Sequence, residues 1–205
     1  MKFLITAGPT REKIDPVRFI TNYSSGKMGY ALAAAAQKAG HQVILISGPV
    51  VLPCPDDVER IFVESAAEMA AAVHKNAVNA DVIIMAAAVA DYRPAHPETS
   101  KMKKMPGDLM LQLERTEDIL ASLGKSKTGN QLLIGFAAET DDLEKNALGK
   151  LQRKNLDWIA ANWVKDGFGT ASNSLILFNR NGDKFVFENT EKELLAKRML
   201  ETILK

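Results

Sequence analysis

The chain has 205 residues, of which 46% are hydrophobic and 25% are charged, a composition that fits one globular α/β domain over residues 1–205. Its formal net charge of +1 argues against a protein that coats nucleic acid or an anionic membrane. The apolar run in the N-terminal "MKFLITAG" is too short for a signal peptide or a membrane span. The one cysteine, Cys54, cannot form an internal disulfide, so we expect a reducing cytoplasm and a thiol without a catalytic role.

The first half of the chain alternates short apolar runs with alanine-rich segments. Strands are predicted over residues 2–8, 41–49 and 58–65, and a fourth begins at 81 and ends in small residues by 92. Helices are predicted over 30–40, where Gly40 provides a stop, and over 66–80. Strands and helices that alternate at this spacing predict a Rossmann-like, doubly wound and mostly parallel sheet.

The second half opens with an interruption. Residues 93–108 are rich in proline and lysine and have little periodicity, so we expect a mobile loop there. After it, the pattern predicts strands over 109–116, 131–140 and 156–163, and helices over 117–125 and 141–155. Residues 173–189 predict a β-hairpin around Asn181-Gly182, and a terminal helix closes the chain.

Three predicted strands end in small residues, in "TAGPT", "AAAVADY" and "GFAAET". Ligands of open parallel sheets bind at the carboxyl ends of strands, where small residues allow a close approach to the backbone. The segment "NYSSGKMG", residues 22–29, precedes the first predicted helix. Asn22, Ser24 or Ser25 is expected to cap that helix, and Gly26 lets an anion come near the main chain. The segment predicts either a phosphate-binding turn or an ordinary capped helix.

Common phosphate motifs do not match this turn. Lys27 is followed by Met28, which excludes a P-loop, and Gly8 is followed by Pro9, which breaks the dinucleotide fingerprint. Tyr23 and Lys27 have the Tyr-x-x-x-Lys spacing of short-chain dehydrogenases but lie in the wrong part of the chain. A nicotinamide-dependent oxidoreductase on a similar fold and a non-catalytic nucleotide-binding module are kept as the two alternative functions.

Two lysines of the helix predicted over 141–155 lie where apolar residues are expected. Lys150 and Lys154 are four residues apart and share a narrow helical sector with Leu143 and Ala147. This placement predicts ammonium groups directed at an anion beside the sheet, with lysines at the edge of the apolar stripe as the alternative.

Several of these segments occur together in a known family. "ITAGPTREKIDPVRFITNYSSGKMG", "AAAVADYRP", "SKMKK", "IGFAAET" and "KLQRKNLDWIAAN" follow one another in this order. They resemble bacterial phosphopantothenate–cysteine ligases from about residue 3 to the terminal helix. The resemblance implies CTP, 4′-phosphopantothenate and L-cysteine as substrates, an acyl-cytidylate intermediate, Mg²⁺ on the triphosphate, and a homodimer. Nothing in the sequence resembles the flavin-dependent decarboxylase half of many relatives, so we expect a synthetase domain alone.

The resemblance also implies roles for individual residues, and it names none as a metal ligand. Asn22 corresponds to an asparagine that contacts the acyl-cytidylate, and Lys101 to a lysine on a flap within residues 93–116, a segment that can also help to form the dimer. Glu117 stands where the family usually has proline. Contacts with the nucleotide or its phosphates are implied for Ser24, Ser25, Gly26, Ala86, Ala87, Ala88, Asp91, Thr116, Asp118, Ile119, Phe136, Lys150 and Lys154.

Overall fold

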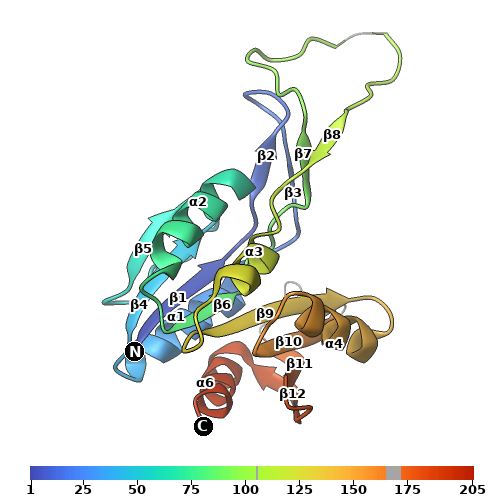
Figure 1. The fold of residues 1–205 in the computed structure, drawn as a ribbon. Coiled ribbons are helices and arrows are strands. Elements are labelled where there is room, and N and C mark those ends of the chain that lie inside the picture. Colours follow the sequence, from blue (N-terminus) through green and yellow to red (C-terminus); the bar gives the residue numbers. More distant parts are fainter. Residues whose placement is uncertain (105, 165–171) are drawn as a thin grey trace.

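The computed structural model describes residues 1–104, 106–164 and 172–205. Its centre is one eight-stranded sheet, shown in Figure 1. The strands of this sheet are β1 (Lys2–Ala7), β4 (Gln42–Ser47), β5 (Glu59–Phe62), β6 (Val82–Met85), β9 (Leu132–Glu139), β10 (Trp158–Trp163), β11 (Ser172–Asn179) and β12 (Lys184–Glu191). Their order in space is β12-β11-β10-β9-β6-β1-β4-β5.

The six strands β10, β9, β6, β1, β4 and β5 pair in parallel, and β11 and β12 continue the sheet as an antiparallel hairpin. The chain leaves β1 for β4 and β5 on one side and then crosses to β6 on the other side. This reversal of strand order marks a doubly wound sheet, so the predicted fold class is confirmed. The predicted hairpin is also present, and Gly182 turns the chain with a φ of 93°.

Helices cover both faces of the sheet. They are α1 (Lys27–Lys38), α2 (Ala66–Ala77), α3 (Ile119–Ser126), α4 (Leu143–Arg153) and α6 (Lys192–Ile203). The residues of α1 and α6 share one buried cluster with Phe3 and Ile5 of β1, and those of α2, α3 and α4 share the other with Leu4. Because both faces are buried, β1 and β6 read as continuous apolar runs, and each large side chain contributes about 1.5–3 kcal/mol by its burial.

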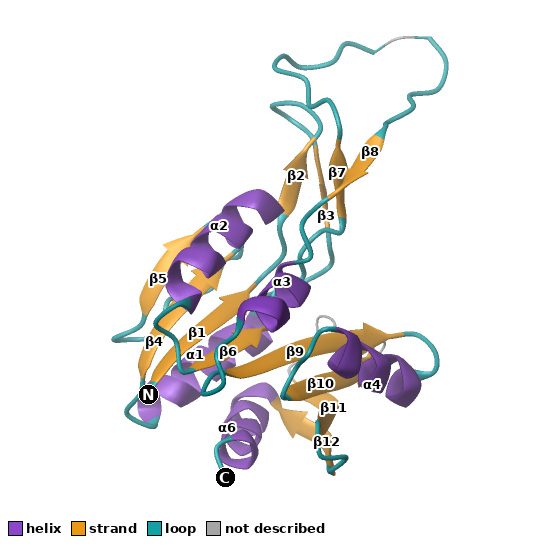
Figure 2. Ribbon diagram, viewed as in Figure 1, coloured by secondary structure: helices purple, strands orange, loops and turns teal. Residues whose placement is uncertain are grey.

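Two short hairpin ribbons extend from the carboxyl edge of the sheet and form an arm, defined here as residues 11–21 and 92–115 (Figures 1 and 2). One ribbon pairs β2 (Arg11–Lys13) with β3 (Phe19–Thr21), and the other pairs β7 (Tyr92–Pro94) with β8 (Leu113–Arg115). The sequence patterns did not predict the first ribbon. The strand predicted over 109–116 shortens to β8, since its partner β7 has only three residues to pair with it.

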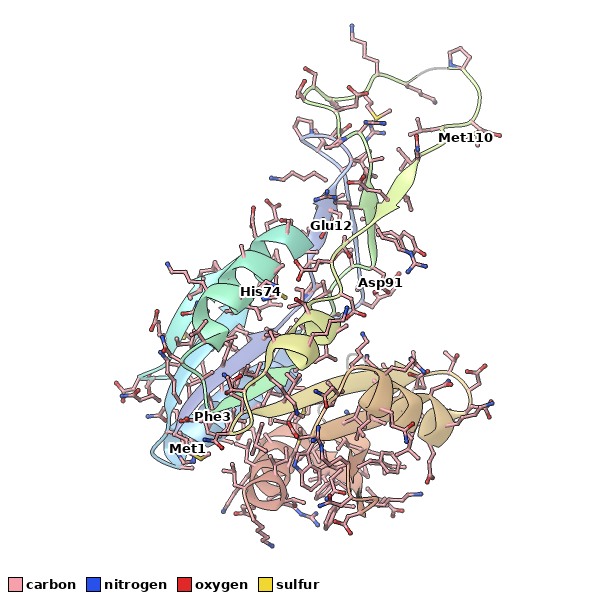
Figure 3. The ribbon with its side chains drawn as sticks, viewed as in Figure 1. Met1, Phe3, Glu12, His74, Asp91 and Met110 are labelled. Carbon is pink, nitrogen blue, oxygen red and sulfur yellow. The ribbon has the colours of Figure 1, made fainter. Side chains whose placement is uncertain are left out.

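The arm is tied to the helical layer by a buried carboxylate. Glu12 of β2 is 3% exposed, and its Oε1 accepts a hydrogen bond of 2.8 Å from the N–H of Ala66, the first residue of α2. A carboxylate at a helix N-terminus is favoured by the helix dipole. Figure 3 shows Glu12 beside the end of α2. This contact fixes the direction in which the first ribbon leaves the sheet.

Candidate functional site

A first group of predicted site residues lies around the ends of β1 and β6, where the strand order reverses. The N–H of Ala88 donates to the carbonyl of Gly8 at 2.9 Å, and the carbonyl of Ala88 accepts from the N–H of Thr10 at 3.2 Å. The side-chain amide of Asn22 donates to the same carbonyl of Ala88 at 3.2 Å. Asn22 and the segment Ala86–Ala88 are therefore held together at this edge by contacts across the sheet.

The turn before α1 differs from the sequence expectation. None of Asn22, Ser24 and Ser25 caps the helix: the N-cap is Gly26, with a φ of 74°, and no side chain of the described residues bonds to the first turn there. Ser24 instead accepts a long hydrogen bond of 3.4 Å from the N–H of Gly26. The expectation is wrong because a left-handed glycine turns the chain straight into the helix. The first N–H groups of α1 thus keep their capacity to bind an anion.

A second glycine brings this helix close to the sheet. A Cβ on Gly29 would lie 2.6 Å from the Cβ of Ala7 and 2.8 Å from the carbonyl oxygen of Thr6. Real side chains do not tolerate such distances, so only glycine permits this packing. The N-terminus of α1 consequently lies directly against the end of β1, where the helix dipole acts on a ligand at the edge.

Two buried threonines, which the sequence analysis did not single out, hold the segment that follows β6. Thr6 Oγ1 accepts from the N–H of Ala87 at 3.1 Å, and Thr10 Oγ1 accepts from the N–H of Ala90 at 2.9 Å. Both threonines are fully buried. The available signal was a pair of hydroxyl residues around the small-residue end "TAGPT", since a buried hydroxyl needs a hydrogen-bond partner.

The second group of predicted residues surrounds two ammonium groups. Lys150 Nζ donates to the carbonyl of Phe136 at 2.6 Å, and Lys154 Nζ lies 2.8 Å from the carboxylate of Asp118. Phe136 belongs to β9, Asp118 is the N-cap of α3, and Lys154 is the C-cap of α4. The strand β9 and the helices α3 and α4 therefore bring these groups together, although Lys154 and Asp118 lie 36 residues apart along the chain.

The charges of this cluster influence one another. Burial lowers the pKa of Lys150, and the nearby ammonium of Lys154 lowers it further, whereas Glu139, Asp118 and Asp91 act in the opposite direction. Burial raises the pKa of Asp118, but hydrogen bonds from Lys154 and from the N–H of Ala121, together with the positive charges of Lys154 and Lys150, outweigh it, so the net shift is downward. A partly desolvated ammonium group of this kind gains strongly from a phosphate ligand.

The turn 116–119 connects the two groups of residues. Thr116 Oγ1 donates to the carbonyl of Ala90 at 2.5 Å, and its N–H donates to the carbonyl of Asp91 at 3.0 Å. Ile119 is 3% exposed, so its side chain belongs to the core. Glu117 Oε1 lies 2.6 Å from Nε2 of His74 in α2, a contact that a proline at this position would not make.

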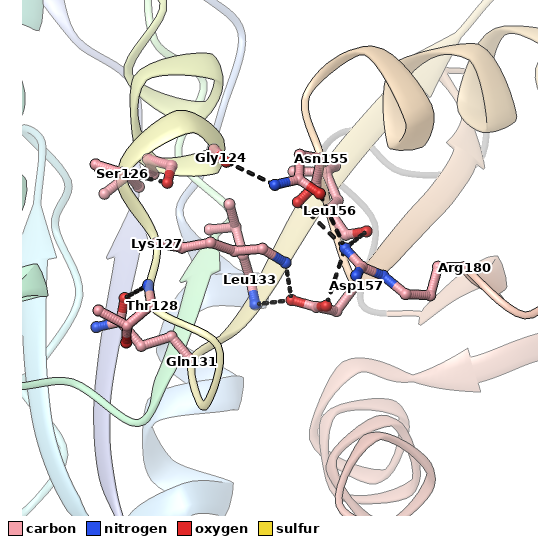
Figure 4. A network of polar contacts seen from close by, with 11 residues as sticks. Gly124, Ser126, Lys127, Thr128, Gln131, Leu133, Asn155, Leu156, Asp157 and Arg180 are labelled. Atoms are coloured by element: carbon pink, nitrogen blue, oxygen red, sulfur yellow. Dashed lines mark hydrogen bonds and ion pairs between the residues drawn. The ribbon is translucent and has the colours of Figure 1, made fainter.

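The backbone of Lys154 is fixed by close packing and by the polar network shown in Figure 4. A Cβ on Gly124 would lie 1.9 Å from the carbonyl oxygen of Lys154, so α3 and the end of α4 touch there. Asn155 Nδ2 donates to the carbonyl of Gly124 at 2.8 Å, and Asp157 binds Lys127 Nζ at 2.7 Å. These contacts determine where the side chain of Lys154 can reach.

Lys101 is not brought to these groups within the chain. Its side chain is exposed on the arm, and the neighbouring Met102 bonds to Asp15 and Arg18 in the turn between β2 and β3. Figure 3 shows Asp91 at the base of the arm and Met110 toward its outer end. The predicted flap lysine therefore lies away from Asn22 in this conformation.

Other features of the described residues lie outside this edge. A cavity of about 1,120 Å³ runs along α1 and α6, and none of the predicted site residues lines it. Within residues 1–104, 106–164 and 172–205, no cluster of three or more histidine, cysteine or acidic side chains is placed to hold a metal ion. No helix in those ranges is long and apolar enough to span a membrane.

The fold and this site define a doubly wound α/β protein with an open helix N-terminus and paired lysines at the carboxyl edge of its sheet, a class that typically binds nucleotides there. Comparison with known families specifies it further. The chain belongs to the family described as DNA/pantothenate metabolism flavoprotein C-terminal domain, whose model matches residues 1–205. The family resemblance that the sequence motifs indicated is confirmed.

Individual relatives agree with this assignment. The chain is 54% identical to the coenzyme A biosynthesis bifunctional protein CoaBC of Bacillus subtilis over 88% of the chain and 45% of that protein. It is 46% identical to CoaBC of Escherichia coli over 100% of the chain and 52% of that protein. A relative from an unknown prokaryotic organism, named a cysteine/cysteine sulfinic acid decarboxylase, is 47% identical over 99% of the chain and 58% of its own length. The chain thus spans about half the length of these curated relatives.

Solved structures give the same result. A crystal structure of the C-terminal domain of CoaBC has a TM-score of 0.85 and 46% identity, with 98% of this chain and 93% of that chain covered. The DNA/pantothenate metabolism flavoprotein from Streptococcus pneumoniae has a TM-score of 0.85 and 25% identity, with 100% and 98% covered. A Cab2 mutant solved with phosphopantothenate-cysteine has a TM-score of 0.81 at 18% identity, with 98% and 86% covered, and supports the fold alone.

Proposed function

We propose that this chain is a CTP-dependent phosphopantothenate–cysteine ligase that acts in coenzyme A biosynthesis. The observation that carries the proposal is the match of the whole chain to the C-terminal domain of CoaBC, a bifunctional protein of coenzyme A biosynthesis. The carboxyl edge supports it independently, since it combines an uncapped helix N-terminus with the ammonium groups of Lys150 and Lys154. Acid activation by a nucleoside triphosphate needs these anion-binding features.

The proposed reaction has two steps. A carboxylate oxygen of 4′-phosphopantothenate attacks the α-phosphorus of CTP, the bond to pyrophosphate breaks, and an acyl-cytidylate forms. The amine nitrogen of L-cysteine then attacks the activated carbonyl carbon, loses a proton, and the bond to CMP breaks. The protein contributes positioning and charge neutralisation, because the cytidylate itself supplies the leaving group.

The predicted site residues have different roles in these two steps. Lys150 and Lys154 bind the triphosphate, and the turn Ser24–Gly26 binds a phosphate at the N-terminus of α1. Asn22, which already donates to the carbonyl of Ala88, orients the acyl carbonyl for the second step. Mg²⁺ would be carried mainly by phosphate oxygens and water, and the carboxylates of Asp91 and Asp118, whose charges act on Lys150, are acidic groups near that position.

Release of pyrophosphate tests the proposal against its alternatives. The purified protein should release pyrophosphate from CTP only when 4′-phosphopantothenate is present, and should form CMP only after L-cysteine is added. Parallel assays with ATP test the choice of nucleotide. A nicotinamide-dependent oxidoreductase or a non-catalytic nucleotide-binding module would release no pyrophosphate, and that result would refute the assignment.

We further infer that the site is completed in a homodimer formed through the arms. The arm carries exposed apolar side chains, among them Val17, Leu109 and Met110, the last 92% exposed. Lys101 lies on the arm and away from Asn22 of its own chain, which favours its action in the second copy. An equal mixture of Asn22→Asp and Lys101→Gln subunits should then recover about a quarter of the wild-type rate, because half of the symmetric dimers regain one intact site. No recovery would place Lys101 in its own subunit's site.

A further inference from the structure

The turn between β2 and β3 contains a carboxylate that is buried although it lies on the arm. Asp15 is 2% exposed. Its Oδ1 accepts from the N–H groups of Val17 and Arg18, both at 2.8 Å, which is how an aspartate commonly closes a turn. Its Oδ2 is used differently, since it binds the guanidinium of Arg18 through Nε at 3.0 Å and Nη2 at 2.5 Å.

The same Oδ2 reaches a segment far along the chain. It accepts from the N–H of Met102 at 3.1 Å, and Arg18 Nη2 donates to the carbonyl of Met102 at 3.3 Å. Both polar groups of the Met102 residue are therefore held by the Asp15–Arg18 pair. We call these contacts the clasp.

A second contact fixes the same segment four residues earlier. The N–H of Glu98 donates to the carbonyl of Ile14 at 2.9 Å. Lys101 lies between Glu98 and Met102 and directly precedes the clasped residue. Its backbone consequently has little freedom to move relative to the first ribbon, while its ammonium group remains exposed.

The ribbon also determines how far Lys101 is from the edge of the sheet. Asn22 follows β3, and four residues at about 3.3 Å each put roughly 13 Å between Arg18 and Asn22. A lysine side chain spans only about 6 Å, less than this separation, which favours a target for Lys101 other than Asn22 of its own chain. The clasp thus fixes the position on the arm from which the Lys101 ammonium group extends.

We propose that Asp15 is a positioning residue for the ligation: with Arg18 it clamps Met102 and holds Lys101 where the arm delivers it to a substrate. The inference rests on the proposed function, in which Lys101 acts on the substrate. The alternative is that Asp15 only shapes its own turn through Oδ1.

Asp15 keeps the negative charge that the clasp needs. The hydrogen bond from Arg18 lowers the pKa of this carboxyl far below its ordinary value, and it exceeds the opposing effect of burial. Hydrogen bonds from the N–H groups of Val17, Met102 and Arg18 lower the pKa further. The carboxylate is therefore ionised throughout the pH range in which the enzyme would be assayed.

Asp15→Asn separates the two roles, because an asparagine oxygen still accepts the two turn N–H groups while the charge that binds Arg18 is lost. We expect CTP affinity by calorimetry to stay within about twofold, while turnover falls by about tenfold to a hundredfold, the cost of misplacing a reacting group. Amide exchange at Met102 should become faster. Asp108→Asn, an exposed aspartate on the same loop, is the matched control and should change neither turnover nor exchange.

The same substitution in a protein that lacks Lys101 distinguishes a positioning role of Asp15 from a general loss of structure. In the Lys101→Gln protein, Asp15→Asn should change turnover by less than about twofold, because the group being positioned is already absent. If Asp15→Asn fails to fold, Arg18→Gln decides, since it removes the guanidinium that binds Asp15 Oδ2 and the carbonyl of Met102 and should lower turnover in the same way. Unchanged turnover, or equal losses with and without Lys101, would overturn the proposal. A wild-type protein without pyrophosphate release would instead overturn the function on which it rests.

Discussion

Replacement of Lys154 by glutamine is the most direct test of whether the carboxyl edge binds a nucleotide. The Lys154 ammonium lies 2.8 Å from the carboxylate of Asp118, and its side chain is 21% exposed. Glutamine keeps much of the length and can still hydrogen bond to Asp118, but it carries no charge. The change therefore removes the attraction for a triphosphate and leaves the packing at Gly124 intact, because that contact is made by the backbone.

The size of the effect follows from the type of contact. A hydrogen bond to a charged group is worth about 1.5–3 kcal/mol, so the dissociation constant for CTP should rise by roughly 10- to 150-fold. Folding should be affected far less, because Asp118 is 52% exposed and an exposed ion pair contributes about 0–1 kcal/mol. A large loss of affinity with a small loss of stability is thus the expected combination.

Isothermal titration calorimetry with CTP measures the affinity, and denaturant unfolding measures the stability. Lys145→Gln, an exposed lysine of the same helix, is the matched control and should leave CTP affinity unchanged. If Lys154→Gln binds CTP as tightly as the wild type, or if both variants weaken binding equally, the assignment of Lys154 to the triphosphate is wrong.

Three further predictions concern other parts of the site. Asn22→Asp should slow the second half-reaction by about a hundredfold in single-turnover assays and the first much less, as expected for a lost oxyanion donor; equal slowing of both would contradict this role. Gly29→Ala should lower the free energy of unfolding by about 1–3 kcal/mol, because its Cβ would lie 2.6 Å from that of Ala7, whereas Gly129→Ala, in open space, should not. Because the pKa of Lys150 is lowered from 10.5, the unfolded chain holds more protons just below that pH, and stability should rise with pH through that window. Lys150→Met should remove this slope in denaturant titrations carried out at pH values just below 10.5.

Much of the fold could be predicted because its signals are local. Apolar runs, alanine-rich segments and the Asn181-Gly182 turn each act within a few residues, and the structure has strands, helices and a hairpin where they were expected. The small residues at the ends of β1, β6 and β9 likewise predicted a ligand site at one edge, since parallel strands end on the same side of a sheet. Lys150 and Lys154 were singled out from helical periodicity alone.

Tertiary structure decided the features that depend on contacts between distant residues. Gly26 begins α1 in place of a serine because a turn packed against Gly8 needs a left-handed residue, which no local cap preference reveals. The Lys154–Asp118 pair joins residues 36 apart, and the hydrogen bond from Met102 to Asp15 joins residues 87 apart. The sequence by itself determined the elements and predicted the edge of the sheet at which a ligand is expected, since periodicity and propensity are properties of short segments. Only the folded chain determined which charges meet, because such contacts form between segments that the fold brings together.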